Sequence, residues 1–112
     1  MDLAVDCYEF TRSFPKEEMY GMTSQIRRAA VSIAANIAEG YGRDQTGLFV
    51  QFLRIAQGSL KELETHLILA GRVGLCGAGE AAHLLERSDA LGRMLRSFIR
   101  SLQQRAQGAA TC

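Results

Sequence analysis

A line of polar side chains runs along the helix predicted over residues 23–41, at a spacing that allows hydrogen-bond chemistry. In the stretch SIAANIAEGYGR (32–43), Ser32, Asn36, Glu39 and Arg43 follow one another at steps of 4, 3 and 4, and Arg28 lies four residues before Ser32. At about 100° per residue, these side chains share one face of a helix. Serine and asparagine are poor choices for an exposed helical surface, because they compete for backbone hydrogen bonds. We therefore expect a buried or interfacial polar network in which Glu39 pairs with an arginine such as Arg43. The alternative is a solvent-exposed face that happens to contain few lysines.

The same region offers little for catalysis or for metal binding. Neither histidine lies near the polar line in the sequence, and no pair of nucleophile and base is visible. Gly40-Tyr41-Gly42 follows a helix rather than a strand, and a helix C-terminus repels anions, so we expect no phosphate-binding loop there. Cysteines 7, 76 and 112 are far apart and form no Cys-x-x-Cys motif, which argues against zinc and favours reduced thiols. The sequence thus predicts no enzyme, no metal site and no cofactor.

Arginines gather near the C-terminus. Residues 90–112 contain four arginines and no acidic residue, although the net charge of the whole chain is only +1. Arg93, Arg96 and Arg100 share one face of the last predicted helix, and arginine binds phosphate through a planar pair of hydrogen bonds. We therefore expect these three residues to contact nucleic acid, mainly through phosphates, since aromatic surface for base stacking is scarce. The alternative is that these cations only complement the dipole at a helix C-terminus.

Apolar residues recur at steps of 3 and 4 throughout the chain, and strand signals are almost absent. We expect four helices, over residues 1–13, 23–41, 44–70 and 80–104, followed by a frayed tail over residues 105–112. Pro15 ends the first helix, Thr23 or Ser24 caps the second, and Gly42 ends it in a left-handed conformation. Short connections then predict an all-α, antiparallel up-and-down four-helix bundle with a short first helix, in one domain of residues 1–112.

Two features of these helices favour self-association. The first helix is about half as long as the third and fourth, so part of their apolar seam lacks a cover within the chain. The predicted seam of the fourth helix consists of Leu84, Ser88, Leu91, Leu95, Phe98 and Leu102. The second helix carries one apolar stripe of isoleucines and another of alanine and valine, whereas a monomeric bundle needs one buried face per helix. We therefore expect a homo-oligomer.

The cytoplasm is the expected location. No apolar run approaches the roughly 18 residues that a membrane span requires. In the N-terminal residues MDLAVDCYEF an acidic residue directly follows Met1, and the basic region of a signal peptide is lacking. The sequence therefore predicts no membrane association.

The turn PKEE and the blocks TSQIRRAAVSIAANIAEGYGR and FLRIAQGSLKELETHL occur in an order that resembles a known bacterial family. These are the four-helix-bundle proteins encoded by intervening sequences of large-subunit (23S) ribosomal RNA genes, and the resemblance covers roughly residues 14–100. It implies an antiparallel bundle, assembly as a homopentamer and no enzymatic activity. A related branch, the accessory proteins of diversity-generating retroelements, implies binding to nucleic acid and to a reverse transcriptase. Ser59 and Glu62 match motif positions of the family, and we assign both to the polar network of the preceding helix.

Two functions follow from these observations. The first is a non-enzymatic homo-oligomer, a pentamer by resemblance, that binds RNA or DNA through its arginines. The alternative is a scaffold for a reverse transcriptase or a ribosome-associated protein, with no nucleic-acid contact of its own. The clustered arginines favour the first function, and the near-neutral isoelectric point of about 7.8 favours the second.

Overall fold

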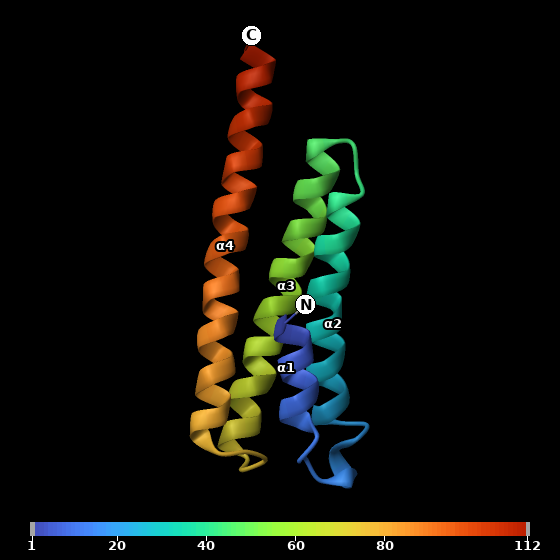
Figure 1. Cartoon of the computed structure of the whole chain (residues 1–112), viewed down its shortest axis with the longest axis vertical. Helices are drawn as coiled ribbons and strands as arrows, with labels where there is room; N and C mark the ends of the chain where they lie inside the picture. Colours follow the sequence, from blue (N-terminus) through green and yellow to red (C-terminus); the bar gives the residue numbers. More distant parts are fainter. Residues whose placement is uncertain (1, 112) are drawn as a thin grey trace.

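The chain of 112 residues folds into four α-helices and one 3-10 turn in a computed structural model, which describes residues 2–111 apart from the side chains of residues 78 and 107–111. The elements are α1 (Asp2–Thr11), η1 (Lys16–Glu18), α2 (Met22–Tyr41), α3 (Thr46–Arg72) and α4 (Ala78–Thr111). Successive helices run in opposite directions, and α1 lies beside the lower halves of α2 and α4 (Figure 1). The predicted all-α, antiparallel four-helix bundle is therefore confirmed.

Several helix ends differ from the sequence prediction. α1 ends at Thr11 rather than Ser13, since the chain turns through a bond from the Phe14 amide to the Thr11 carbonyl. α2 is not capped by Thr23 or Ser24. It begins at Met22, whose amide donates to the Glu18 carboxylate of the preceding turn at 3.4 Å.

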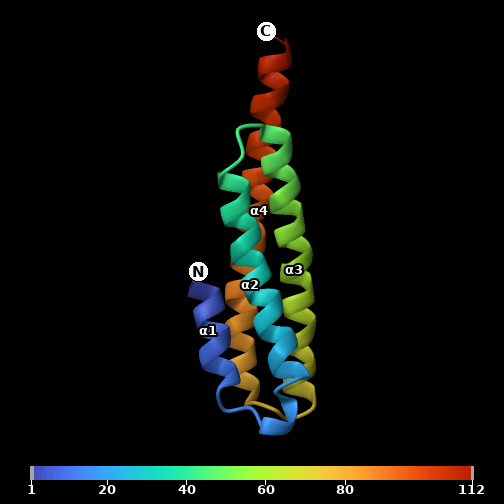
Figure 2. The same cartoon turned by 90° about the vertical axis from the view of Figure 1, so that its right-hand side faces the viewer.

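The ends of the later helices also need correction. Gly42 is right-handed, with φ −80°, so it is not the predicted left-handed cap, and its amide bonds carbonyls of the last turn. Gly74, at φ +79°, provides the left-handed conformation instead, beyond the end of α3. α4 ends at Thr111 rather than at the predicted residue 104, so it includes residues 105–111, the stretch for which we predicted a frayed tail. Figure 2 shows this end of α4 projecting past the other helices.

A single apolar core joins the four helices. Each helix contributes residues from one face, as the steps of 3 and 4 predict. Its larger buried side chains include Cys7 of α1, Ile26 of α2, Leu53, Leu60, Leu63 and Leu67 of α3, and Leu84, Leu95 and Ile99 of α4. α2 and α3 are in close contact at Gly40, where an added Cβ would lie 2.8 Å from the Phe49 ring.

The short first helix leaves part of this core open, as predicted. α1 has 10 residues, against 27 in α3 and 34 in α4. Within the described residues the backbones of α2 and α4 are not adjacent, and α1 separates them at one end. Beyond α1 the two helices touch through the rings of Tyr41 and Phe98, whose centres lie 6.2 Å apart, and an apolar groove of about 670 Å³ remains between them. The groove is lined mainly by Ile37, Tyr41, Leu53, Leu91, Met94 and Phe98. We call this the α2–α4 groove.

No helix in the described part of the chain is long and apolar enough to cross a membrane.

Candidate functional site

Ser32, Asn36 and Ser59 form a hydrogen-bonded link between α2 and α3. The hydroxyl oxygens of Ser32 and Ser59 lie 2.7 Å apart, and Asn36 Nδ2 donates to the Ser32 carbonyl at 2.8 Å and to its hydroxyl at 3.2 Å. Ser59 is buried and the other two are half-buried. The bond between the two serines joins α2 to α3 and so helps to hold these helices in register. Neither serine is hydrogen-bonded to a described histidine or carboxylate, so the described contacts provide no base that would activate a nucleophile.

Glu39 and Arg43 pair with each other at the surface of the chain. The Arg43 Nη2 lies 2.6 Å from Glu39 Oε2, and the guanidinium also stacks over the Phe52 ring at 5.1 Å. The Glu39 side chain is 56% exposed and that of Arg43 43% exposed. The expected pairing is thus present, but Glu39 is not buried within one chain. Such exposed pairs contribute only about 0–1 kcal/mol to stability.

The remaining two members of the predicted network lie outside it. Arg28 and Glu62 are both exposed, and neither makes a side-chain hydrogen bond or ion pair with another described residue. The structure therefore joins three of the seven predicted residues into one cluster and two into a separate pair.

The three predicted arginines of α4 share one exposed face of that helix, and the two grooves that flank this face divide them between their linings. Arg93 lines the α2–α4 groove beside Met94, and its Nη2 lies 3.3 Å from Asp89 Oδ2. Arg96 and Arg100 instead line a shallow groove of about 370 Å³ between α3 and α4, together with Arg54 of α3. We call this second surface the arginine groove. Its remaining lining residues are Gln57, Ile99 and Gln103, with no acidic residue among them.

Arg54 was not predicted from the sequence, because its neighbours depend on how α3 and α4 pair. Gly71 lies against Ala81 and Gly92 against Leu60, which fixes the register of the antiparallel hairpin. This register brings Arg54 level with the turn of α4 that carries Arg96 and Arg100. The predicted connection over residues 71–79 could have revealed the pairing by counting outward from its centre along both helices.

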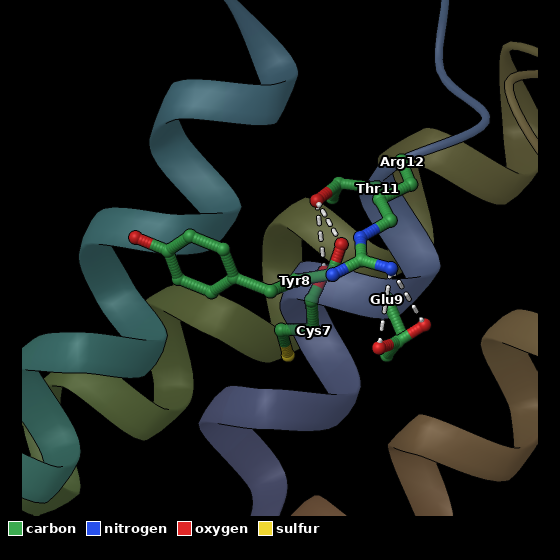
Figure 3. A network of polar contacts seen from close by, with 5 residues as sticks. All are labelled: Cys7, Tyr8, Glu9, Thr11 and Arg12. Atoms are coloured by element: carbon green, nitrogen blue, oxygen red, sulfur yellow. Dashed lines mark hydrogen bonds and ion pairs between the residues drawn. The ribbon is translucent and has the colours of Figure 1, made fainter.

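A second unpredicted contact links α1 to α2. Arg27 Nε donates to the Thr11 hydroxyl at 2.8 Å, and its guanidinium lies 4.6 Å from the centre of the Tyr8 ring. The Thr11 hydroxyl donates in turn to the Cys7 carbonyl at 2.9 Å. In Figure 3, Tyr8 extends from one side of α1, and Glu9 and Arg12 form an ion pair on another side. One aromatic side chain, Tyr8, and one cationic side chain, Arg27, are thus held together at the α1–α2 junction.

The thiols show no sign of activation. Burial raises the pKa of Cys7 to about 11, so this thiol stays protonated near neutral pH. Partial burial, with the nearby Glu80 carboxylate, also raises the pKa of Cys76. Cys112 lies outside the described residues. No group of three or more possible metal ligands occurs in the part of the chain that the structure describes.

Comparisons with known proteins place these features in a family context. Residues 1–97 match the family model described as 23S rRNA-intervening sequence protein. A solved structure from Bacteroides thetaiotaomicron, described as a protein with unknown function from the S23 ribosomal protein family, is similar with a TM-score of 0.78 and 27% sequence identity. The match covers 88% of this chain and 92% of that chain. A search of curated proteins finds no match.

Proposed function

The chain belongs to the family of 23S rRNA-intervening sequence proteins, and we propose that it is a non-enzymatic, cytoplasmic homo-oligomer that binds RNA or DNA through the arginine groove. The observation that carries this function is the convergence of Arg54, Arg96 and Arg100 from two helices. None of the three forms an ion pair with another described residue. Their positive charges therefore remain available to an external anion.

The chemistry of the arginine groove suits a polynucleotide backbone. Each guanidinium can bind a phosphate through two parallel hydrogen bonds, and the amides of Gln57 and Gln103 add neutral donors. The groove contains no aromatic side chain on which a base could stack. Binding at this groove would therefore depend on charge and would carry little sequence preference.

Assembly is supported by the α2–α4 groove. Tyr41 and Met94, which line it, are each 67% exposed in the single chain, and contiguous exposed apolar surface is unusual for a monomer. A second copy that packs against this groove would cover the part of the core that α1 does not reach. The family resemblance makes five copies the specific proposal, in a ring that repeats the arginine groove and raises avidity.

A salt titration tests nucleic-acid binding. Anisotropy of labelled single-stranded RNA and duplex DNA is measured with the full chain from low to moderate salt. A triple variant that combines Arg54→Gln, Arg96→Gln and Arg100→Gln should lose three phosphate contacts. The negative slope of log K against log salt should then become less steep by about 2–3. Arg12→Gln, Lys16→Gln and Arg72→Gln combined change the net charge equally and should leave most of the slope intact. Negligible binding by the unmodified chain at low salt would refute this function.

The same preparations test assembly. Sedimentation equilibrium at micromolar concentration should give about five times the chain mass of 12.3 kDa. Met94→Asp places a charge in the α2–α4 groove and should shift the mass toward the monomer. A species of one chain mass in the unmodified protein would refute the oligomer.

The alternative function is a scaffold for a reverse transcriptase or a ribosome-associated protein. The net charge of +1 and the isoelectric point near 7.8 favour it, since strong non-specific nucleic-acid binders usually carry more positive charge. Assembly without any affinity for nucleic acid would support this alternative.

A further inference from the structure

A third groove lies where α1, η1 and α2 meet, and none of the proposed contacts uses it. Its volume is about 420 Å³, within the range of sites for small molecules. Tyr8, Met19, Tyr20, Arg27, Arg28 and Val31 make up most of its lining. No acidic residue lines it, although η1 carries Glu17 and Glu18 nearby. The groove therefore combines two aromatic rings with two guanidinium groups.

One half of the groove is held in place by contacts inside the bundle. The Thr11 hydroxyl, from a buried residue, accepts from Arg27 Nε at 2.8 Å, and this bond fixes the guanidinium 4.6 Å from the Tyr8 ring centre. Because Thr11 is neutral, the charge of Arg27 is not cancelled. The terminal nitrogens of the guanidinium form no hydrogen bond with described residues and remain free to donate.

The other half of the groove presents its groups to solvent. Tyr20 is 93% exposed, so its ring contributes almost nothing to the core of the chain. Arg28 is exposed and makes no ion pair among the described residues. Glu18 is directed elsewhere, since its carboxylate accepts from the Met22 amide at the start of α2. A free aromatic ring and a free cation thus lie beside the fixed pair of Tyr8 and Arg27.

We propose that this groove binds a single-stranded nucleic acid, with bases stacked on Tyr20 and Tyr8 and phosphates held by Arg27 and Arg28. The proposal rests on the proposed nucleic-acid function and names the form of polymer that is bound. A nucleotide joins a planar base to an anion, and the groove places rings and cations together. In a duplex the bases are already stacked on one another, so only single strands can use the two rings. The arginine groove, in contrast, can bind the backbone of either form.

The tyrosines provide a direct optical test. The chain has no tryptophan and three tyrosines, so its intrinsic fluorescence comes from tyrosine alone. In a Tyr41→Phe background only Tyr8 and Tyr20 emit. Titration with a 12-nucleotide oligothymidylate should quench this emission, after correction for absorbance, and a 12-base-pair duplex should not.

Affinity measurements separate stacking from simple apolar contact. Loss of one base–aromatic stack should weaken binding of the single strand by about 5- to 100-fold in Tyr20→Leu and leave duplex binding unchanged. Tyr20→Phe keeps the ring and should bind normally. Because Tyr20 is almost fully exposed, neither variant should unfold the chain.

Three results would overturn the proposal, each in a distinguishable way. If Tyr20→Leu binds single strands normally and the Tyr41→Phe protein shows no quenching, this groove is not a binding site. The arginine groove then remains as the nucleic-acid site. A change in sedimentation mass in Tyr20→Leu would show that the groove is a contact between protein chains. Absence of binding to either polymer would refute the proposed function itself.

Discussion

The close approach of α2 and α3 at Gly40 gives a sharp test of the packing in this bundle. A Cβ added at Gly40 would lie 2.8 Å from Phe49 Cδ1 and 3.3 Å from Phe52 Cβ. The Phe49 ring cannot easily move away, because the ring centres of Tyr41 and Phe98 lie only 5.0 and 5.4 Å from its own. Gly40→Ala should therefore strain the contact between the two helices.

Gly58 is the matched control for this substitution. It also lies inside a helix, but an added Cβ would meet no atom within 4 Å. Alanine stabilises a helix interior by about 0.5–1 kcal/mol relative to glycine, and this gain should appear in full for Gly58→Ala. At Gly40 the same gain is opposed by overpacking, which typically costs about 1–3 kcal/mol.

The two variants should consequently differ by about 1–3 kcal/mol in the free energy of unfolding, with Gly40→Ala the less stable. For a chain of this size the difference corresponds to about 4–12 °C in Tm. Thermal denaturation followed by circular dichroism measures it, at one protein concentration because assembly adds to stability. If Gly40→Ala proves as stable as Gly58→Ala, α2 and α3 are not in close contact at Gly40.

Two further predictions concern buried polar groups. Ser88 is fully buried and its hydroxyl has no partner among the described residues, whereas the buried Ser59 is bonded to Ser32. Ser88→Ala should therefore raise the free energy of unfolding by about 1 kcal/mol, and Ser59→Ala should not; equal effects in urea titrations would contradict the assigned bonds. The second prediction follows from the Cys7 pKa, which burial raises from 9.0 to about 11. Above pH 9 the unfolded chain releases this proton before the folded chain does, so stability should fall between pH 9 and 11 more steeply than in Cys7→Ala, as pH-dependent urea titrations would show. Parallel pH profiles for the two proteins would refute the raised pKa.

The sequence predicted the helices well, because apolar periodicity reports directly on which face is buried. In the seam predicted for α4, Leu84, Ser88, Leu95 and Leu102 are indeed buried. Leu91 and Phe98 are only half-buried. Both line the α2–α4 groove, which α1 is too short to cover. Periodicity thus identified the face of α4, and the length of a different helix decided how much of that face is closed.

The candidate sites were predicted only where they depend on one helix. Ser32 and Asn36 belong to the same face of α2, and their contact follows from a step of four residues. The arginine groove and the pair of Arg27 with Tyr8 each join two helices. The positions of these residues depend on how two helices pack and in which register. The spacing of residues within a single helix does not determine either. The capping error at α2 has a similar cause, since Glu18 reaches the Met22 amide from a neighbouring turn.

The two grooves that flank α4 give the proposed assembly and the proposed binding separate surfaces. Arg93 and Met94 line the α2–α4 groove, whereas Arg96 and Arg100 line the arginine groove beside α3. A copy seated on the first groove would therefore leave the arginine groove open to a polynucleotide. Arg93 lies at the edge of the α2–α4 groove, and its charge is already paired with Asp89 at 3.3 Å. Of the three predicted arginines, Arg93 is therefore the least available to an external phosphate, and in the proposed site Arg54 of α3 joins Arg96 and Arg100 in its place.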